Sequence, residues 1–166
     1  PEEFSWLGGI VSKYQSSAAN GYLLRLTDQA PYTGLSFDEA TTSTGVLNAN
    51  QWYHIAGTFE GTTGKLYIDG AYAAQDTTAD LGFKALMVGV NRSHDTDSRY
   101  WKGYLDELKV YHGAKSQQEI AQDCWDESSS CSYVPITPTN LSTLVHSPPL
   151  FSPDPSLLSN DEASIR

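Results

Sequence analysis

The chain has 166 residues and contains ten lysine and arginine residues and twenty aspartate and glutamate residues, which gives a formal net charge of -10. This balance argues against a nucleic-acid partner and an anionic membrane surface, because phosphate binding needs clustered basic side chains. No stretch approaches the roughly 20 apolar residues of a membrane helix, so we expect no membrane insertion by this segment. The length suits one domain with a sizeable core.

Short apolar segments separated by turn signals fill the chain from Gly8 to Tyr111, which is the pattern of an all-β sandwich. Seven strands are predicted, at residues 10–14, 22–27, 34–39, 52–59, 65–69, 86–90 and 104–111. The glycine-containing links at residues 60–64 and 69–70 predict hairpins, since glycine readily adopts positive φ. Links this short favour antiparallel pairing throughout.

Alternation along these strands predicts the side chains that share the core. The candidates are Leu24, Leu26, Trp52, Leu66, Ile68, Val88, Leu108 and Val110. In the last strand, Asp106 falls on the same face as Leu108, whereas Glu107 falls on the other. A buried carboxylate needs donors or a cation, so we expect Asp106 either to accept backbone N–H groups or to bind calcium.

The character of the sequence changes after the last predicted strand. Ser116 followed three residues later by Glu119 is a capping-box pattern and predicts a short C-terminal helix. Cys124 and Cys131 have no further ligand at metal-binding spacing, which favours a local disulfide over zinc. Residues 132–166 are rich in Pro, Ser, Thr and Asn, which predicts a disordered tail, stalk or linker.

The segment from Asn91 to Trp101 has the densest set of polar side chains and two adjacent aromatic residues. Such a mixture suits sugar recognition, because hydroxyl groups need donors and acceptors while a sugar face stacks on an aromatic ring. The alternative is an ordinary solvated loop whose aromatic residues turn inward. The predicted ligand contacts are Asn91, Arg92, His94, Asp95, Asp97, Tyr100 and Trp101.

Two tripeptides match the N-glycosylation acceptor pattern, at Asn91 and Asn140. They agree with the predicted disulfide in favouring a secretory route. A glycan at Asn91 would crowd the predicted ligand loop, and in that case the binding surface must lie elsewhere.

Three pairs of segments resemble the LamG-like jellyroll family of the concanavalin A-like lectin/glucanase superfamily. They are GIVSKY at residues 9–14 with GYLLRL at 21–26, WYHIAGTFEG at 52–61 with KLYIDG at 65–70, and LMVGV at 86–90 with YLDELKVY at 104–111. The resemblance implies an antiparallel two-sheet jellyroll over residues 1–124, followed by a disulfide loop and tail at 125–166. Family domains normally begin with a strand pair before the first segment, so we expect the jellyroll to be truncated at its N-terminus.

The resemblance also implies a function. Relatives are usually extracellular or cell-surface recognition modules that bind glycans or proteins, often with a structural calcium ion. We expect calcium-assisted glycan binding here. The alternatives are a protein-binding adhesion or structural module, and an accessory domain of a larger secreted enzyme.

Catalysis by this domain is not expected. Glycoside hydrolysis needs two carboxyl groups facing one cleft. The acidic doublets Asp38-Glu39 and Asp106-Glu107 are each adjacent in a predicted strand, and neighbouring strand residues point to opposite faces. The sequence also has no Gly-x-Ser-x-Gly elbow, His-Glu-x-x-His motif or phosphate-binding loop.

Overall fold

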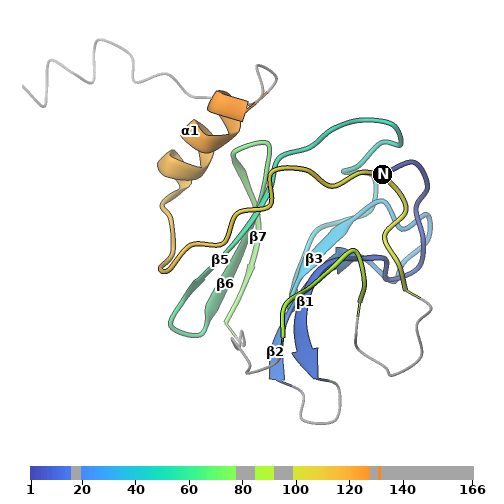
Figure 1. Ribbon diagram of the computed structural model, residues 1–166, viewed down its shortest axis with the longest axis horizontal. Helices are drawn as coiled ribbons and strands as arrows, with labels where there is room; N and C mark the ends of the chain where they lie inside the picture. Colours follow the sequence, from blue (N-terminus) through green and yellow to red (C-terminus); the bar gives the residue numbers. More distant parts are fainter. Residues whose placement is uncertain (16–19, 78–84, 92–98, 128–130, 132–166) are drawn as a thin grey trace, which may run out of the picture. The chain divides into compact units, whose positions relative to one another are not determined.

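The computed structural model describes residues 1–15, 20–77, 85–91, 99–127 and 131 (Figure 1). The predicted tail at 132–166, which includes the sequon at Asn140, lies outside these residues. The described chain is mostly β-structure in two antiparallel sheets with one short helix, as the sequence predicts for the fold class. None of its helices is long and apolar enough to cross a membrane.

The larger sheet has the strand order β4-β3-β2-β1-β8. Its strands are β1 (Gly9–Gln15), β2 (Asn20–Leu26), β3 (Leu35–Phe37), β4 (Ala40–Thr41) and β8 (Met87–Val88). The central pairing aligns Val11 with Leu24, and Leu24 in turn lies opposite Phe37. The first two predicted strands are confirmed, whereas the predicted strand at 86–90 is reduced to two residues.

The smaller sheet consists of β5 (Ile55–Glu60), β6 (Thr63–Ile68) and β7 (Ala71–Asp76) in that order. Both predicted hairpins are confirmed, since Glu60 pairs with Thr63 and Ile68 pairs with Ala71. In the second hairpin Asp69 and Gly70 both have positive φ, of 49° and 77°, as a tight two-residue turn between twisted strands requires.

The two sheets pack through one apolar core. Leu26, Leu35 and Leu66 are at most 1% exposed, and Phe37 of β3 meets Phe59 of β5 with ring centroids 4.6 Å apart. The predicted core positions Leu24, Leu26 and Leu66 are confirmed, and Ile68 packs against the same cluster while partly buried.

The core prediction is wrong for four residues, which are exposed because no described segment packs over them. Trp52 is 64% exposed and precedes β5 instead of opening it, and Val88 on the edge strand β8 is 48% exposed. Leu108 and Val110 are 51% and 68% exposed. Residues 104–111 form no strand, since no described segment pairs with them.

The predicted strand at 34–39 is also wrong at its end. Asp38 has φ of 54°, and Phe37 pairs with Ala40, so the chain reverses at Asp38 and Glu39. Asp38 and Glu39 are therefore turn residues, and the alternation of a strand does not place their side chains on opposite faces.

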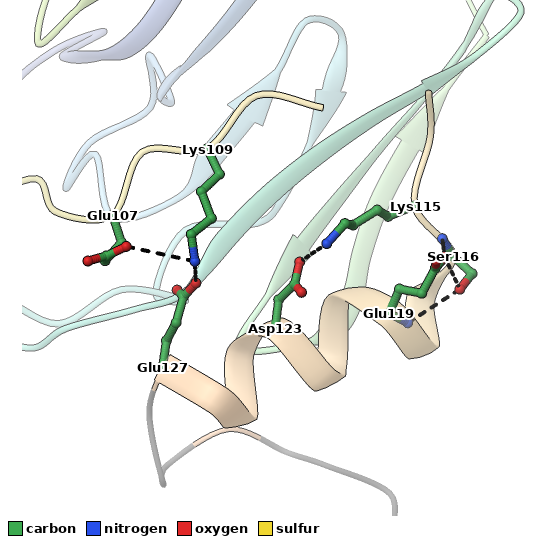
Figure 2. Close-up of polar contacts among 7 residues, drawn as sticks. All are labelled: Glu107, Lys109, Lys115, Ser116, Glu119, Asp123 and Glu127. Atoms are coloured by element: carbon green, nitrogen blue, oxygen red, sulfur yellow. Dashed lines mark hydrogen bonds and ion pairs between the residues drawn. The ribbon is translucent and has the colours of Figure 1, made fainter. Parts of the chain in front are cut away.

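The predicted helix is α1 (Gln117–Glu127), and its capping box is formed (Figure 2). Ser116 Oγ accepts the backbone N–H of Glu119 at 3.3 Å, and the Glu119 carboxylate accepts the backbone N–H of Ser116 at 2.8 Å. Lys115 pairs with Asp123, and Lys109 pairs with Glu127.

The helix lies against the sheet that contains β7 (Figure 1). Its buried residues are Ile120, Ala121 and Cys124, and a Cβ on Gly70 would come within 2.9 Å of the Ala121 Cα. Cys124 forms the predicted disulfide with Cys131, with their Cα atoms 5.7 Å apart.

Candidate functional site

Four of the seven predicted ligand contacts, Arg92, His94, Asp95 and Asp97, lie outside the described residues. The two ends of the loop are described. The backbone N–H of Asn91 donates to the Arg99 carbonyl at 3.0 Å, which holds the two ends together.

Asn91 is buried within the fold, not on a binding rim. Its side chain is 3% exposed, and Nδ2 donates to the Leu7 carbonyl at 3.1 Å. This placement does not fit a ligand contact or a glycan on the same nitrogen, because the side chain already supports the segment that precedes β1.

The two aromatic residues at the other end of the loop differ in exposure. Tyr100 is 50% exposed and makes isolated bridges to Gly9 and Val90. Trp101 packs against the core, and its Nε1 donates to the Tyr104 carbonyl at 3.3 Å. Of the two candidates for a stacking platform, Tyr100 is therefore the more exposed. Trp101 turns inward, as the solvated-loop alternative predicts for both aromatic residues.

The prediction that Asp106 is buried is wrong. Asp106 is exposed, and one of its carboxylate oxygens accepts the backbone N–H of Glu107 at 2.9 Å. The predicted strand at residues 104–111 does not form. No described sheet therefore covers the face that Asp106 was expected to share with Leu108.

A polar pocket lies where β2, β3 and β4 run side by side. The registers place Arg25 opposite Ser36 and Ser36 opposite Thr41, so these three side chains form a row across the sheet. Because Leu24 and Leu26 face the core, this row lies on the opposite face. The cavity has a volume of about 170 Å³, and its lining residues are Leu7, Arg25, Thr27, Asp28, Ser36, Asp38, Glu39 and Thr41.

The turn that carries two of the pocket's carboxylates is held by its neighbours. Ser36 Oγ donates to the Asp38 carbonyl at 2.6 Å, and Thr41 Oγ1 donates to the Glu39 carbonyl at 3.1 Å. The reversal at Asp38 thus places both acidic residues of the doublet beside the same pocket.

Arg25 is the cation of this pocket. Burial lowers the pKa of its guanidinium, while the negative charges of Glu39 and Asp28 act in the opposite direction. Its Nε and the Thr27 Oγ1 are buried without a hydrogen-bond partner among the described residues. An unmatched buried polar atom costs free energy, which a water molecule or a polar group of a ligand can offset.

An aromatic residue, Trp6, directly precedes Leu7, which lines the pocket. The Arg99 guanidinium stacks over the half-exposed Trp6 ring, 4.2 Å from its centroid, and the next residue, Leu7, lines the cavity. Arg99 also acts electrostatically on Arg25. At the described end of the predicted ligand loop, Arg99 thus contacts Trp6, the residue that precedes Leu7 in the chain.

The residues around the pocket do not fit a calcium ion. Calcium takes six to eight oxygen ligands, whereas this pocket presents a guanidinium among its carboxylates. Within the described residues, three metal-ligating groups come together only at Asp69, Cys124 and Cys131, where the two sulfurs are joined as a disulfide. Calcium binding stays a prediction, with Asp106 as its candidate ligand.

Residues 1–121 match the Laminin G 3 family, which is described as the concanavalin A-like lectin/glucanases superfamily. The match covers most of the chain, so this protein belongs to that family. No curated protein matches the sequence.

Among solved structures, the chain is similar to an S-layer domain-containing protein from Clostridium thermocellum, with 22% sequence identity and a TM-score of 0.42. The matched region covers 74% of this chain and 65% of that one.

The pocket cannot be read from the sequence because two of its three acidic residues, Asp38 and Glu39, lie on a turn within a segment that the sequence predicts as a strand. One signal is present in the sequence: at the end of β2, Leu24 and Leu26 alternate with Arg25 and the following Thr27. This alternation places a cation and a hydroxyl on the face away from the core. The sequence does not show which turn residues meet that face.

Proposed function

We propose that this domain is a non-catalytic, extracellular recognition module that binds a glycan at the pocket around Arg25. The observation that carries the proposal is the pair of buried, unpartnered polar atoms, Arg25 Nε and Thr27 Oγ1, in a pocket that also presents carboxylates. Membership of the lectin and glucanase superfamily and the disulfide support a glycan ligand and an oxidising compartment.

The chemistry of the pocket suits a polyhydroxy ligand. A guanidinium donates hydrogen bonds to sugar oxygens, while the carboxylates of Asp28, Asp38 and Glu39 can accept hydrogen bonds from hydroxyl groups. The cavity of about 170 Å³ is smaller than the roughly 300–1,000 Å³ of pockets for drug-sized ligands, so it suits one terminal sugar residue rather than a chain.

The charge of the pocket selects among glycans. Three acidic residues and one arginine line the pocket, and the whole chain carries a net charge of -10, so uronic acids and sulfated sugars are disfavoured. Neutral sugars and amino sugars remain as the ligand classes.

A glycan array followed by calorimetric titration tests the proposal, with neutral, amine-bearing and uronate-bearing oligosaccharides in calcium or in chelator. Arg25→Gln is expected to weaken binding at least tenfold, because a hydrogen bond from a charged group contributes about 1.5–3 kcal/mol. Thr27→Val removes the hydroxyl at nearly constant shape and is expected to weaken binding less.

Lys13→Gln is the matched control, since Lys13 lies on β1 of the same sheet but does not line the pocket. Wild-type affinity in both Arg25→Gln and Thr27→Val, with the fold intact by circular dichroism, would remove the pocket as the binding site. Calcium-dependent binding that survives both changes would instead point to the loop with Asp95 and Asp97.

Glycoside hydrolysis is the second candidate function, and the turn at Asp38 and Glu39 favours it. Both residues line one pocket with Asp28, so the pocket has more than one carboxyl group, as a glycosidase requires. Release of reducing ends from a neutral β-glucan, abolished by Glu39→Gln, would establish this activity. Binding without hydrolysis would support the recognition module.

A further inference from the structure

The disulfide at the end of α1 lies against the turn between β6 and β7. Cys124 is fully buried and Cys131 is 7% exposed. A carboxylate oxygen of Asp69 and the two sulfur atoms all lie within 4.8 Å of one another. An acidic group therefore faces both sulfurs of a nearly inaccessible bond.

The Asp69 carboxylate is held in this position by its backbone. Asp69 has φ of 49°, and its N–H donates to the His54 carbonyl at 2.8 Å. One carboxylate oxygen accepts the His54 N–H at 2.9 Å. These two contacts to the residue before β5 fix the direction of the side chain.

The basic side chains described near the disulfide do not neutralise the negative charge of the Asp69 carboxylate. Helix α1 has no basic residue in its last turn. The lysines that approach the helix are paired elsewhere, Lys115 with Asp123 and Lys109 with Glu127 (Figure 2).

We propose that Asp69 protects the Cys124–Cys131 disulfide from reduction by repelling attacking thiolates. Reduction by a small thiol begins when its thiolate attacks one sulfur, here Cys131 as the more exposed, forming a mixed disulfide and expelling the Cys124 thiolate. A second thiolate then attacks the sulfur of the reagent, which releases Cys131 and leaves the oxidised reagent as its disulfide. Both steps place negative charge beside Asp69, so the carboxylate disfavours each of them.

The test compares reduction rates with three thiols of different charge, mercaptoethanesulfonate, mercaptoethanol and cysteamine, at equal thiolate concentrations. Reduction is followed by alkylation and mass shift. The wild-type protein is expected to react fastest with the cationic reagent and slowest with the anionic one. Asp69→Asn is expected to accelerate the anionic reagent by roughly tenfold and the cationic one much less.

Asp69→Asn removes only the charge. Asparagine keeps the Oδ1 acceptor for the His54 N–H and tolerates positive φ. Glu60→Gln is the control, an exposed acid at the far end of β5. If Asp69→Asn does not fold, the reduction rates of the wild type are measured in roughly 1 M salt instead. The Debye length is then about 3 Å, so the preference of the wild type for the cationic thiol is expected to disappear. An unchanged ratio of anionic to cationic rates in Asp69→Asn, or in high salt, would overturn the proposal.

Discussion

Strand β2 and the segment at residues 104–111 have the same kind of sequence and opposite environments. Both contain a short alternation of apolar and polar residues, Leu24-Arg25-Leu26 in β2 and Leu108-Lys109-Val110 in the later segment. In β2, Leu24 and Leu26 are buried, with β1 on one side and β3 on the other. In the later segment, Leu108 and Val110 are more than half exposed and no described strand pairs with them. Alternation shows which side chains share a face, but neighbouring strands decide whether that face is covered.

Local backbone geometry explains why the later segment does not extend as a strand. Glu107 has φ of 49°, which interrupts extended backbone at its centre, and the Asp106 carboxylate accepts the Glu107 N–H. An ion pair between Lys109 and Glu127 fixes the segment to α1 instead (Figure 2). Exposed ion pairs contribute little, so this attachment is weaker than a sheet pairing.

The sharpest test of this contrast is one truncation in each region. Leu66→Ala in β6 is expected to lower the free energy of unfolding by about 2–5 kcal/mol, because Leu66 is fully buried and leaves a cavity. Leu108→Ala is expected to cost about 0.5 kcal/mol or less, since the side chain is half exposed. Urea titration followed by tryptophan fluorescence measures both.

Comparable losses in the two variants would contradict the contrast. They would mean that residues 104–111 are packed in solution against a surface that covers Leu108. A constant denaturant slope in both variants is the control that the unfolding reaction itself has not changed.

The sequence predicts the parts of the fold whose signals are local. The hairpins at residues 60–64 and 69–70, the capping box at Ser116 and the disulfide each depend on a short spacing, and each is confirmed. Strand β7 was not predicted, because its sequence AYAAQD has little β-propensity and it forms through pairing with β6.

The candidate site was less accessible to sequence reasoning. The pocket residues come from separate segments: Arg25 lies on β2 with Thr27 just after it, Asp38 and Glu39 lie on a turn, and Leu7 precedes β1. Only the pairing register brings them together. The polar composition of residues 91–101 drew attention to a neighbouring segment whose first residue, Asn91, supports the fold.

A smaller effect is expected at the start of α1, where two changes separate the capping hydroxyl from the capping charge. Ser116→Ala removes the acceptor for the Glu119 N–H and is expected to destabilise the domain by about 1 kcal/mol. Glu119→Gln is expected to cost less and to change the pH dependence of stability. Thermal unfolding by circular dichroism at several pH values measures both variants.

The sign of the pH effect follows from the hydrogen bonds of Glu119. Hydrogen bonds from the Ser116 side chain and backbone lower the pKa of the Glu119 carboxyl below its ordinary value of 4.5. Its contribution is therefore present above pH 4.5 and is lost as the pH falls through the lowered pKa. Glu119→Gln should flatten this part of the profile, and an identical acid profile in the variant would show that the capping charge does not contribute.

The smallest effects are expected at the acidic doublet of the uncovered segment. If Asp106 were buried, Asp106→Ala would lower the free energy of unfolding far more than Glu107→Ala. The substitution would leave the buried partners of the carboxylate without a hydrogen bond or counter-charge. Both side chains are exposed, so each change is expected to alter the free energy of unfolding by about 0.5 kcal/mol or less. The Asp106 bond to the Glu107 N–H can be replaced by water, which limits its loss. Urea titrations of the two variants beside the wild type decide the matter: a loss at Asp106 exceeding that at Glu107 by about 2 kcal/mol would mean that the strand register predicted from the sequence forms in solution.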